Sequence, residues 1–168
     1  SPWSCIPQAM PGIWKNIPKL MFGHGRPLSV HPRSAFKMIP WGLRFLYQSQ
    51  RDRAIQAADA MSALCGPSIE LFEKHLSGTG HEDLLVDSIY VQAFRDASKA
   101  NLDGLEAHIR ASKGAELEVV GRDELKRLEP ALGPDFQAAV LVKGAARVRT
   151  PGRVAAVLAE KAIAMGAE

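Results

Sequence analysis

The stretch Leu85-Val-Asp-Ser-Ile-Tyr-Val-Gln-Ala-Phe94 decides the fold, because it alternates like a strand with two different faces. The mainly apolar face comprises Leu85, Ile89, Val91 and Ala93, with Asp87 as the exception. The other face comprises Val86, Ser88, Tyr90, Gln92 and Phe94. This second face mixes aromatic rings with a hydroxyl and an amide, which is the composition of a pocket wall. A half-buried strand whose Tyr90 and Gln92 merely reach water explains the pattern equally well. We expect this strand at the centre of a sheet.

The composition is that of one ordinary globular domain. The 168 residues are 46% hydrophobic and 23% charged, which does not suit a disordered or fibrous chain. No run of 18 or more apolar residues occurs, so the sequence predicts no membrane-spanning helix. The two cysteines, Cys5 and Cys65, are too few for a disulfide framework, and we expect a reducing, cytoplasmic compartment. Because the chain begins at Ser1 without a signal-peptide pattern, we expect a fragment or a processed chain.

Residues 1–50 are predicted to form an irregular arm rich in proline and aromatic residues. Seven of the eleven prolines lie in residues 1–40. Each proline removes a backbone donor and fixes φ, so we expect no regular helix or central strand there. Apolar residues such as Trp3, Trp14 and Phe22 are too many for a free linker. We therefore expect the arm to lie along a larger body of protein.

Positive charge is concentrated in the same region. Residues 1–53 carry eight Lys or Arg and one acid, Asp52, for a local net charge of +7. Cations interleaved with aromatic rings suit single-stranded nucleic acid or a peripheral membrane contact. Because prolines and apolar residues outnumber the cations, we favour packing against more protein. We predict no nucleic acid, and a peripheral membrane contact stays open as an alternative.

Residues 51–148 are predicted to form a domain of helices and strands, and residues 149–168 a helix that follows it. The longest helical candidate runs from Arg51 to Leu76 and is interrupted at Gly66-Pro67. Asp96 or Ser98 could cap a further helix that Gly114 closes.

Short strands are predicted at residues 116–120 and 138–142, separated by a helix over residues 122–128. Pro151 suits the first turn of the last helix, with Thr150 as its cap. The predicted fold class is therefore α+β, with a mixed or antiparallel sheet and helices packed on one side.

Local motifs exclude several kinds of site. Gly23-His24-Gly25 lacks the third glycine of a dinucleotide-binding loop and predicts a turn. The five histidines show no metal-ligand spacing, so we predict no metal site. Cys5 lies in a basic, acid-free stretch that could raise its reactivity, although a small buried residue explains it better.

Four stretches carry a family resemblance when they are read in order. They are Ser1-Pro-Trp-Ser-Cys-Ile-Pro-Gln-Ala-Met-Pro-Gly12, Pro18-Lys-Leu-Met-Phe with Pro27-Leu-Ser, Pro40-Trp-Gly-Leu-Arg-Phe-Leu46, and Leu125-Lys-Arg-Leu-Glu-Pro-Ala-Leu132 followed by Arg149-Thr-Pro. In this order they resemble FAD-dependent oxidoreductases of the D-amino-acid oxidase type, especially the bacterial D-amino-acid dehydrogenase branch. Asp87-Ser88 stands where that family usually has Gly, and Thr150-Pro151 where it has Asp-Pro.

The resemblance implies the substrate (cap) domain of a larger flavoenzyme that moves a hydride from the substrate α-carbon to FAD. It places Tyr90 and Gln92 on the substrate side, and Ser1, Pro2, Trp3 and Ser4 on the flavin side. Its dinucleotide fingerprint and its substrate-carboxylate arginine lie outside this sequence, so we expect the piece alone to lack FAD and activity. The implied partners are an amino-acid substrate and the remainder of the flavoenzyme chain. The alternative is a non-catalytic module that docks a partner or a membrane through its basic aromatic arm.

Overall fold

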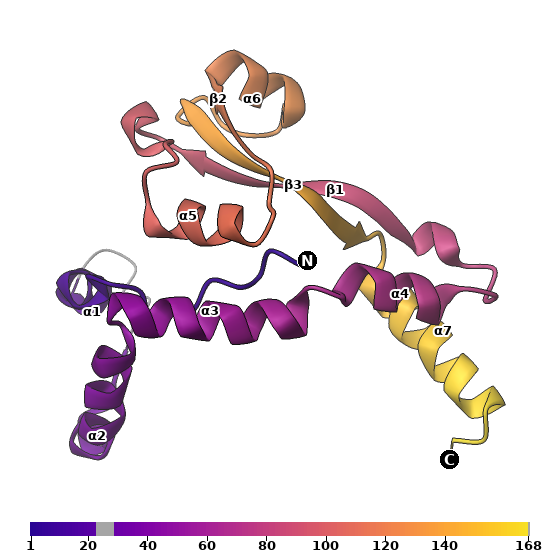
Figure 1. Cartoon of the computed structure of the whole chain (residues 1–168), viewed down its shortest axis with the longest axis horizontal. Coiled ribbons are helices and arrows are strands. Elements are labelled where there is room, and N and C mark those ends of the chain that lie inside the picture. Colours follow the sequence, from indigo (N-terminus) through magenta and orange to yellow (C-terminus); the bar gives the residue numbers. More distant parts are fainter. Residues whose placement is uncertain (23–28, 168) are drawn as a thin grey trace. The chain divides into compact units, whose positions relative to one another are not determined.

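The computed structural model describes residues 1–22 and 29–167 (Figure 1). Its helices are α1 (Ile17–Phe22), α2 (Pro32–Gln48), α3 (Arg51–Cys65), α4 (Ser68–Leu76), α5 (Leu105–Ser112), α6 (Arg122–Leu128) and α7 (Pro151–Ala164). Its strands are β1 (Leu85–Phe94), β2 (Leu117–Gly121) and β3 (Ala138–Val148). Short 3-10 helices lie at Ile13–Lys15, Glu82–Leu84 and Ala97–Lys99. The turn predicted at Gly23-His24-Gly25 lies outside the described residues.

The chain divides into two compact units. Cys5–Met61 form one, here called the helical unit. Ser1–Ser4 and the chain from Ser62 onward form the other, here called the sheet unit. Among the described residues, no helix has both the length and the hydropathy needed to cross a bilayer.

An antiparallel sheet of three strands, ordered β1-β3-β2, organises the sheet unit (Figure 1). β3 takes the middle, and its first five residues, Ala138–Val142, form an apolar run that is buried throughout. A strand buried on both faces has a continuous apolar run, whereas an alternating strand can leave one face in water. The expectation that Leu85–Phe94 lies at the centre is therefore wrong, since β1 is an edge strand. The α+β class and the antiparallel sheet are confirmed.

Helices lie against both faces of this sheet. Leu125 of α6 packs with Leu141 of β3 on one face. Val142, the residue after Leu141, points to the opposite face, and so does its pairing partner Tyr90. On that face, Arg110 of α5 lies near the Tyr90 ring. The prediction of helices on one side only is wrong, because β3 has an apolar side chain on each face and both need cover.

The break predicted at Gly66-Pro67 is confirmed, since α3 ends at Cys65 and α4 begins at Ser68. Beyond it, α4 and α7 share a small core with the 3-10 turn before β1. That core comprises Leu76, Leu84, Val154 and Val157. Lys161 of α7 donates to the carbonyls of His75 and Ser77 at 2.8 and 3.0 Å, which satisfies acceptors left open at the end of α4.

The predicted cap at Asp96 belongs to a different element. Asp96 accepts bonds from the backbone N–H and the hydroxyl of Ser98 at 3.0 and 2.7 Å, and so closes a 3-10 turn. Both bonds lower the pKa of the Asp96 carboxyl, and the bond from the Ser98 hydroxyl has the larger effect. α5 begins only after Gly104, so the predicted cap for this helix is wrong. The predicted stop at Gly114 is confirmed by its positive φ of 90°.

In the helical unit, α2 corrects the expectation of an irregular arm. Pro32 stands in its first turn, where the missing N–H has no helical acceptor, and His31 Nδ1 accepts from the N–H of Arg33 at 3.3 Å. Pro40 removes one further bond, but the turns on either side stay helical. The prediction that proline excludes a regular helix from residues 1–40 is wrong. The assignment of residues 1–50, 51–148 and 149–168 to parts of a larger enzyme stays a prediction.

Candidate functional site

A bulge in β3 lies beside the residue that pairs with Tyr90, one of the two predicted substrate-side residues. The pairing of Ser88 with Ala145 and of Tyr90 with Val142 leaves two β3 residues, Lys143 and Gly144, opposite Ile89 alone. Gly144 has a φ of 68°, which residues with a Cβ adopt only at a cost. A glycine of this kind in a two-against-one pairing bends the strand and increases its twist.

Trp3 docks on this bulge. Its indole Nε1 donates to the carbonyl oxygen of Lys143 at 2.6 Å, and its ring lies 3.6 Å from where a Cβ on Gly144 would stand. Because Val142, the partner of Tyr90, adjoins Lys143, the contact fixes the first residues of the chain near the pairing site of Tyr90. Sequence spacing alone could not show it, since 140 positions separate Trp3 from Lys143.

The first four residues form a closed turn. The backbone N–H of Ser4 donates to the carbonyl of Ser1 at 3.2 Å, and the N–H of Trp3 reaches the Ser1 hydroxyl at 3.4 Å. Cys65 holds the turn from outside, with its Sγ 3.7 Å from the carbonyl oxygen of Ser4. Ser1 and Ser4 are exposed, whereas Pro2 and Trp3 are half-buried.

Tyr90 and Gln92 share the sheet face opposite α6. Tyr90 is 50% exposed, and Gln92 is half-buried. Neither the phenol oxygen nor the amide has a hydrogen-bond partner among the residues that the structure describes. Their polar atoms are therefore free to bind water or a ligand.

Arg110 is a neighbour of Tyr90 that the sequence analysis did not single out. Its guanidinium lies 5.9 Å from the centre of the Tyr90 ring, and the residue is only 9% exposed. Glu106, one turn earlier in α5, approaches Nη1 at 3.5 Å. Nε is buried without a partner among the described residues. The spacing of Glu106 and Arg110 predicts only a helical ion pair, because nothing local to α5 indicates a strand beneath it.

Lys143 extends from the bulge toward β2. Its Nζ lies 2.6 Å from Glu116 and 3.0 Å from Glu118. The hydrogen bonds that the Lys143 ammonium donates to Glu116, and secondly to Glu118, raise the pKa of this ammonium. Two carboxylates thus hold the Lys143 side chain, while the backbone carbonyl of Lys143 accepts a hydrogen bond from the Trp3 indole.

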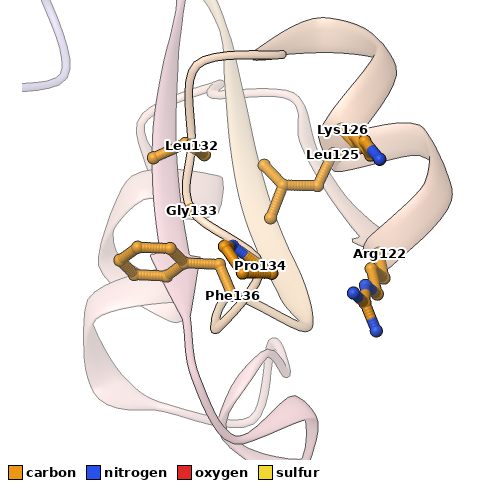
Figure 2. A pocket seen from close by; sticks show the side chains of 7 residues that line it. All are labelled: Arg122, Leu125, Lys126, Leu132, Gly133, Pro134 and Phe136. Carbon is orange, nitrogen blue, oxygen red and sulfur yellow. The ribbon is translucent and has the colours of Figure 1, made fainter.

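A separate hollow of about 110 Å³ lies between α6 and the loop that precedes β3 (Figure 2). It is lined by Arg122, Leu125, Lys126, Leu132, Gly133, Pro134 and Phe136. Leu125, Leu132 and Phe136 belong to the core of that sheet face, and Arg122 and Lys126 are exposed. The hollow is smaller than ordinary ligand pockets, so we treat it as a packing feature of α6.

Comparison with known proteins identifies the family. Residues 29–168 match the family model described as FAD dependent oxidoreductase. The chain belongs to this FAD-dependent oxidoreductase family. The sequence-based prediction is therefore confirmed at the level of the family, and nothing in the comparisons supports a non-catalytic binding module.

Curated relatives of this chain carry related names. A D-amino-acid oxidase of Bradyrhizobium diazoefficiens is 31% identical over 98% of this chain and 39% of its own length. D-amino acid dehydrogenases of Sinorhizobium medicae and Allorhizobium ampelinum are each 27% identical, over 77% and 76% of this chain and 31% and 30% of their own. The chain thus spans about two fifths or less of these proteins. No solved structure matches it significantly.

The turn at Ser1–Ser4 is the predicted flavin side of this chain. In the turn at Ser1–Ser4, the indole and the backbone donors of Trp3 and Ser4 are already used, so this turn is no phosphate cradle. The hydroxyls of Ser1 and Ser4 and the half-buried Trp3 ring remain to line a planar group. Within residues 1–22 and 29–167, no cluster of His, Cys, Asp or Glu could hold a metal ion. The flavin-side, substrate-side and metal assignments all stay predictions.

Proposed function

We propose that this chain is the substrate-side part of an FAD-dependent oxidoreductase that acts on D-amino acids. Family membership and the names of the relatives support the proposal. When bound, the flavin would accept a hydride from the substrate α-carbon, while the protein binds and orients the substrate. The proposed partners are the amino-acid substrate and the remainder of the enzyme chain.

One observation carries the proposal about the site: the Trp3 indole bonds to β3 beside the residue that pairs with Tyr90. Residues 1–4, which we assign to the flavin side, and Tyr90, which we assign to the substrate side, thereby share one stretch of sheet. Gln92 follows on the same face and offers an amide that could accept and donate hydrogen bonds. Arg110 would steady the ring of Tyr90 from beneath as a positioning residue.

The experiment is flavin reduction in the full-length protein under anaerobic conditions. Each of a panel of D-amino acids is mixed with the enzyme, with its L-enantiomer as the control, and loss of oxidised-flavin absorbance is followed. We expect reduction by one or more D-amino acids and none by their mirror images. Reduction by no amino acid of the panel would overturn the proposed substrate class.

The role of Tyr90 is tested separately with Tyr90→Phe. Loss of one hydrogen bond to a bound substrate should raise KM or lower kcat by about threefold to tenfold. Tyr47→Phe is the matched control, because Tyr47 is also 50% exposed but belongs to α2 of the helical unit. Equal kinetic constants for wild type and Tyr90→Phe would remove Tyr90 from the site.

A further inference from the structure

The two cysteines of the chain are 60 positions apart, yet a single peptide group links their surroundings. Cys65 Sγ lies 3.7 Å from the carbonyl oxygen of Ser4, and that carbonyl belongs to the peptide bond that joins Ser4 to Cys5. Ser4 and Cys65 both belong to the sheet unit. Both cysteines are free thiols.

The peptide bond after Ser4 limits how far Cys5 can be from Cys65. The bond is trans, and a planar trans peptide holds its carbonyl oxygen about 2.8 Å from the following Cα. The Cys5 Cα therefore lies no more than about 6.5 Å from the Cys65 Sγ. A disulfide shortens this distance to about 4 Å, so a displacement of roughly 2 Å is enough. Cys65 is the last residue of α3, where rotation of its side chain and a small shift of the last turn can supply that displacement.

The two thiols differ in accessibility. Cys5 is fully buried, whereas Cys65 is half-buried. An oxidant that arrives from solution therefore reaches Cys65 first, and Cys5 can react only with a group brought beside it. An accessible thiol with a second thiol within reach is the arrangement of a redox-sensing pair.

We propose that Cys5 and Cys65 form a reversible disulfide when hydrogen peroxide oxidises the protein. The Cys65 sulfur attacks one peroxide oxygen, the O–O bond breaks, and a sulfenic acid and one water form. The Cys5 sulfur then attacks the Cys65 sulfur, the S–O bond breaks, and the Cys5 proton leaves in a second water. The two thiols together lose two electrons, which the peroxide gains.

The disulfide would tie the turn at Ser1–Ser4 to the end of α3. The same turn is already bonded to β3 through the Trp3 indole. Oxidation would therefore fix the segment that we assign to the flavin side at a second point. The pairing needs only the two thiols and peroxide, so the inference does not depend on the substrate class proposed above.

The test is peptide mapping of the full-length protein without reductant. The reduced protein is treated with hydrogen peroxide, the remaining thiols are blocked with iodoacetamide, and trypsin cleaves after Lys15, Arg53 and Lys74. We expect the peptide that ends at Lys15 to be joined to Ala54–Lys74, with two hydrogens fewer than the separate peptides. Dithiothreitol should separate the two. Absence of this joined peptide after peroxide treatment would overturn the proposal.

Two variants distinguish the disulfide from a merely structural contact. Cys65→Ser keeps a hydrogen-bond donor toward the Ser4 carbonyl, so it should fold but give no joined peptide. Cys5→Ala removes the second thiol without burying a polar group, so the sulfenic acid at Cys65 should persist.

Dimedone, which labels sulfenic acids, should therefore mark Cys65 several-fold more in Cys5→Ala than in the wild type. Circular dichroism verifies that both variants fold. Equal labelling of Cys65 in Cys5→Ala and the wild type would show that Cys5 does not consume the sulfenic acid. That result would also overturn the proposal.

Discussion

The two units of this chain treat their apolar residues in opposite ways. In the sheet unit, Val142 of β3 is fully buried on one face of the sheet. Leu125 of α6, which packs on the other face, is 1% exposed. In the helical unit, Phe36 is 82% exposed and Leu43 is 64% exposed, although both lie in the regular helix α2. The sheet unit thus keeps its own core, while α2 carries apolar surface that needs a partner. Regular secondary structure alone therefore does not indicate which part of a chain is stable by itself.

The largest expected effect comes from exchanging one leucine in each unit for alanine. Leu125→Ala empties a buried position beneath the sheet and should lower the free energy of unfolding by about 3 kcal/mol. Leu43→Ala removes an exposed side chain and should change it by less than about 0.5 kcal/mol. Denaturant unfolding followed by circular dichroism measures both. Equal losses would contradict the contrast between the units.

Two glycine-to-alanine substitutions should have opposite effects on stability. Gly144→Ala forces a Cβ onto a backbone with φ of 68°, which should cost about 1–2 kcal/mol. Gly42→Ala lies inside α2, where a Cβ would meet nothing within 4 Å, and should stabilise that helix by up to about 1 kcal/mol. Thermal unfolding of each variant checks the signs, and a destabilised Gly42→Ala would show that the α2 face is already covered.

Two tryptophans sharpen the comparison further. Trp3→Phe deletes the indole donor to the Lys143 carbonyl and should cost about 1 kcal/mol. Trp14→Phe, at a residue that is 57% exposed in the helical unit, should cost almost nothing. The same pair should differ in fluorescence, because Trp3 is the more enclosed ring. Indistinguishable stabilities would remove the Trp3 contact from the sheet unit.

The smallest effect concerns the pH dependence around the bulge. Glu116 and Glu118 raise the pKa of Lys143, so this interaction stabilises the fold below the ordinary lysine pKa. That contribution is lost as pH rises through the raised value. A titration that follows the lysine Cε resonances should show Lys143 losing its proton at a higher pH than exposed lysines do. Glu116→Gln should shift it back, and an unshifted wild-type resonance would contradict the ion pair.

The sequence predicts best where a boundary is set locally. The helix Arg122–Leu128 lies as predicted, because its first turn is acidic and Glu129-Pro130 ends it. Pro151 begins the last helix as expected, for the reason that a first-turn proline loses no bond. These signals act within a few residues and need no knowledge of the rest of the fold.

What the sequence misses depends on distant partners. The alternation of Leu85–Phe94 fits a central or an edge strand, and only the fully buried run of β3 decides between them. Proline spacing in α2 misled because each ring removes a single bond that flanking turns can spare. Tyr90 and Trp3 could be named as candidates, but their common neighbourhood depends on a bulge at Gly144 that no short motif encodes.

The bond between Trp3 and Lys143 also has a consequence for biosynthesis. The two residues are 140 positions apart, so the indole leaves the ribosome long before its acceptor exists. At ordinary synthesis rates the delay is on the order of ten seconds. Closing so long a loop costs entropy that only an assembled sheet can offset, so Trp3 should dock after β1 and β3 have paired. Until then, the segment around Trp3 would be open to chaperones and proteases.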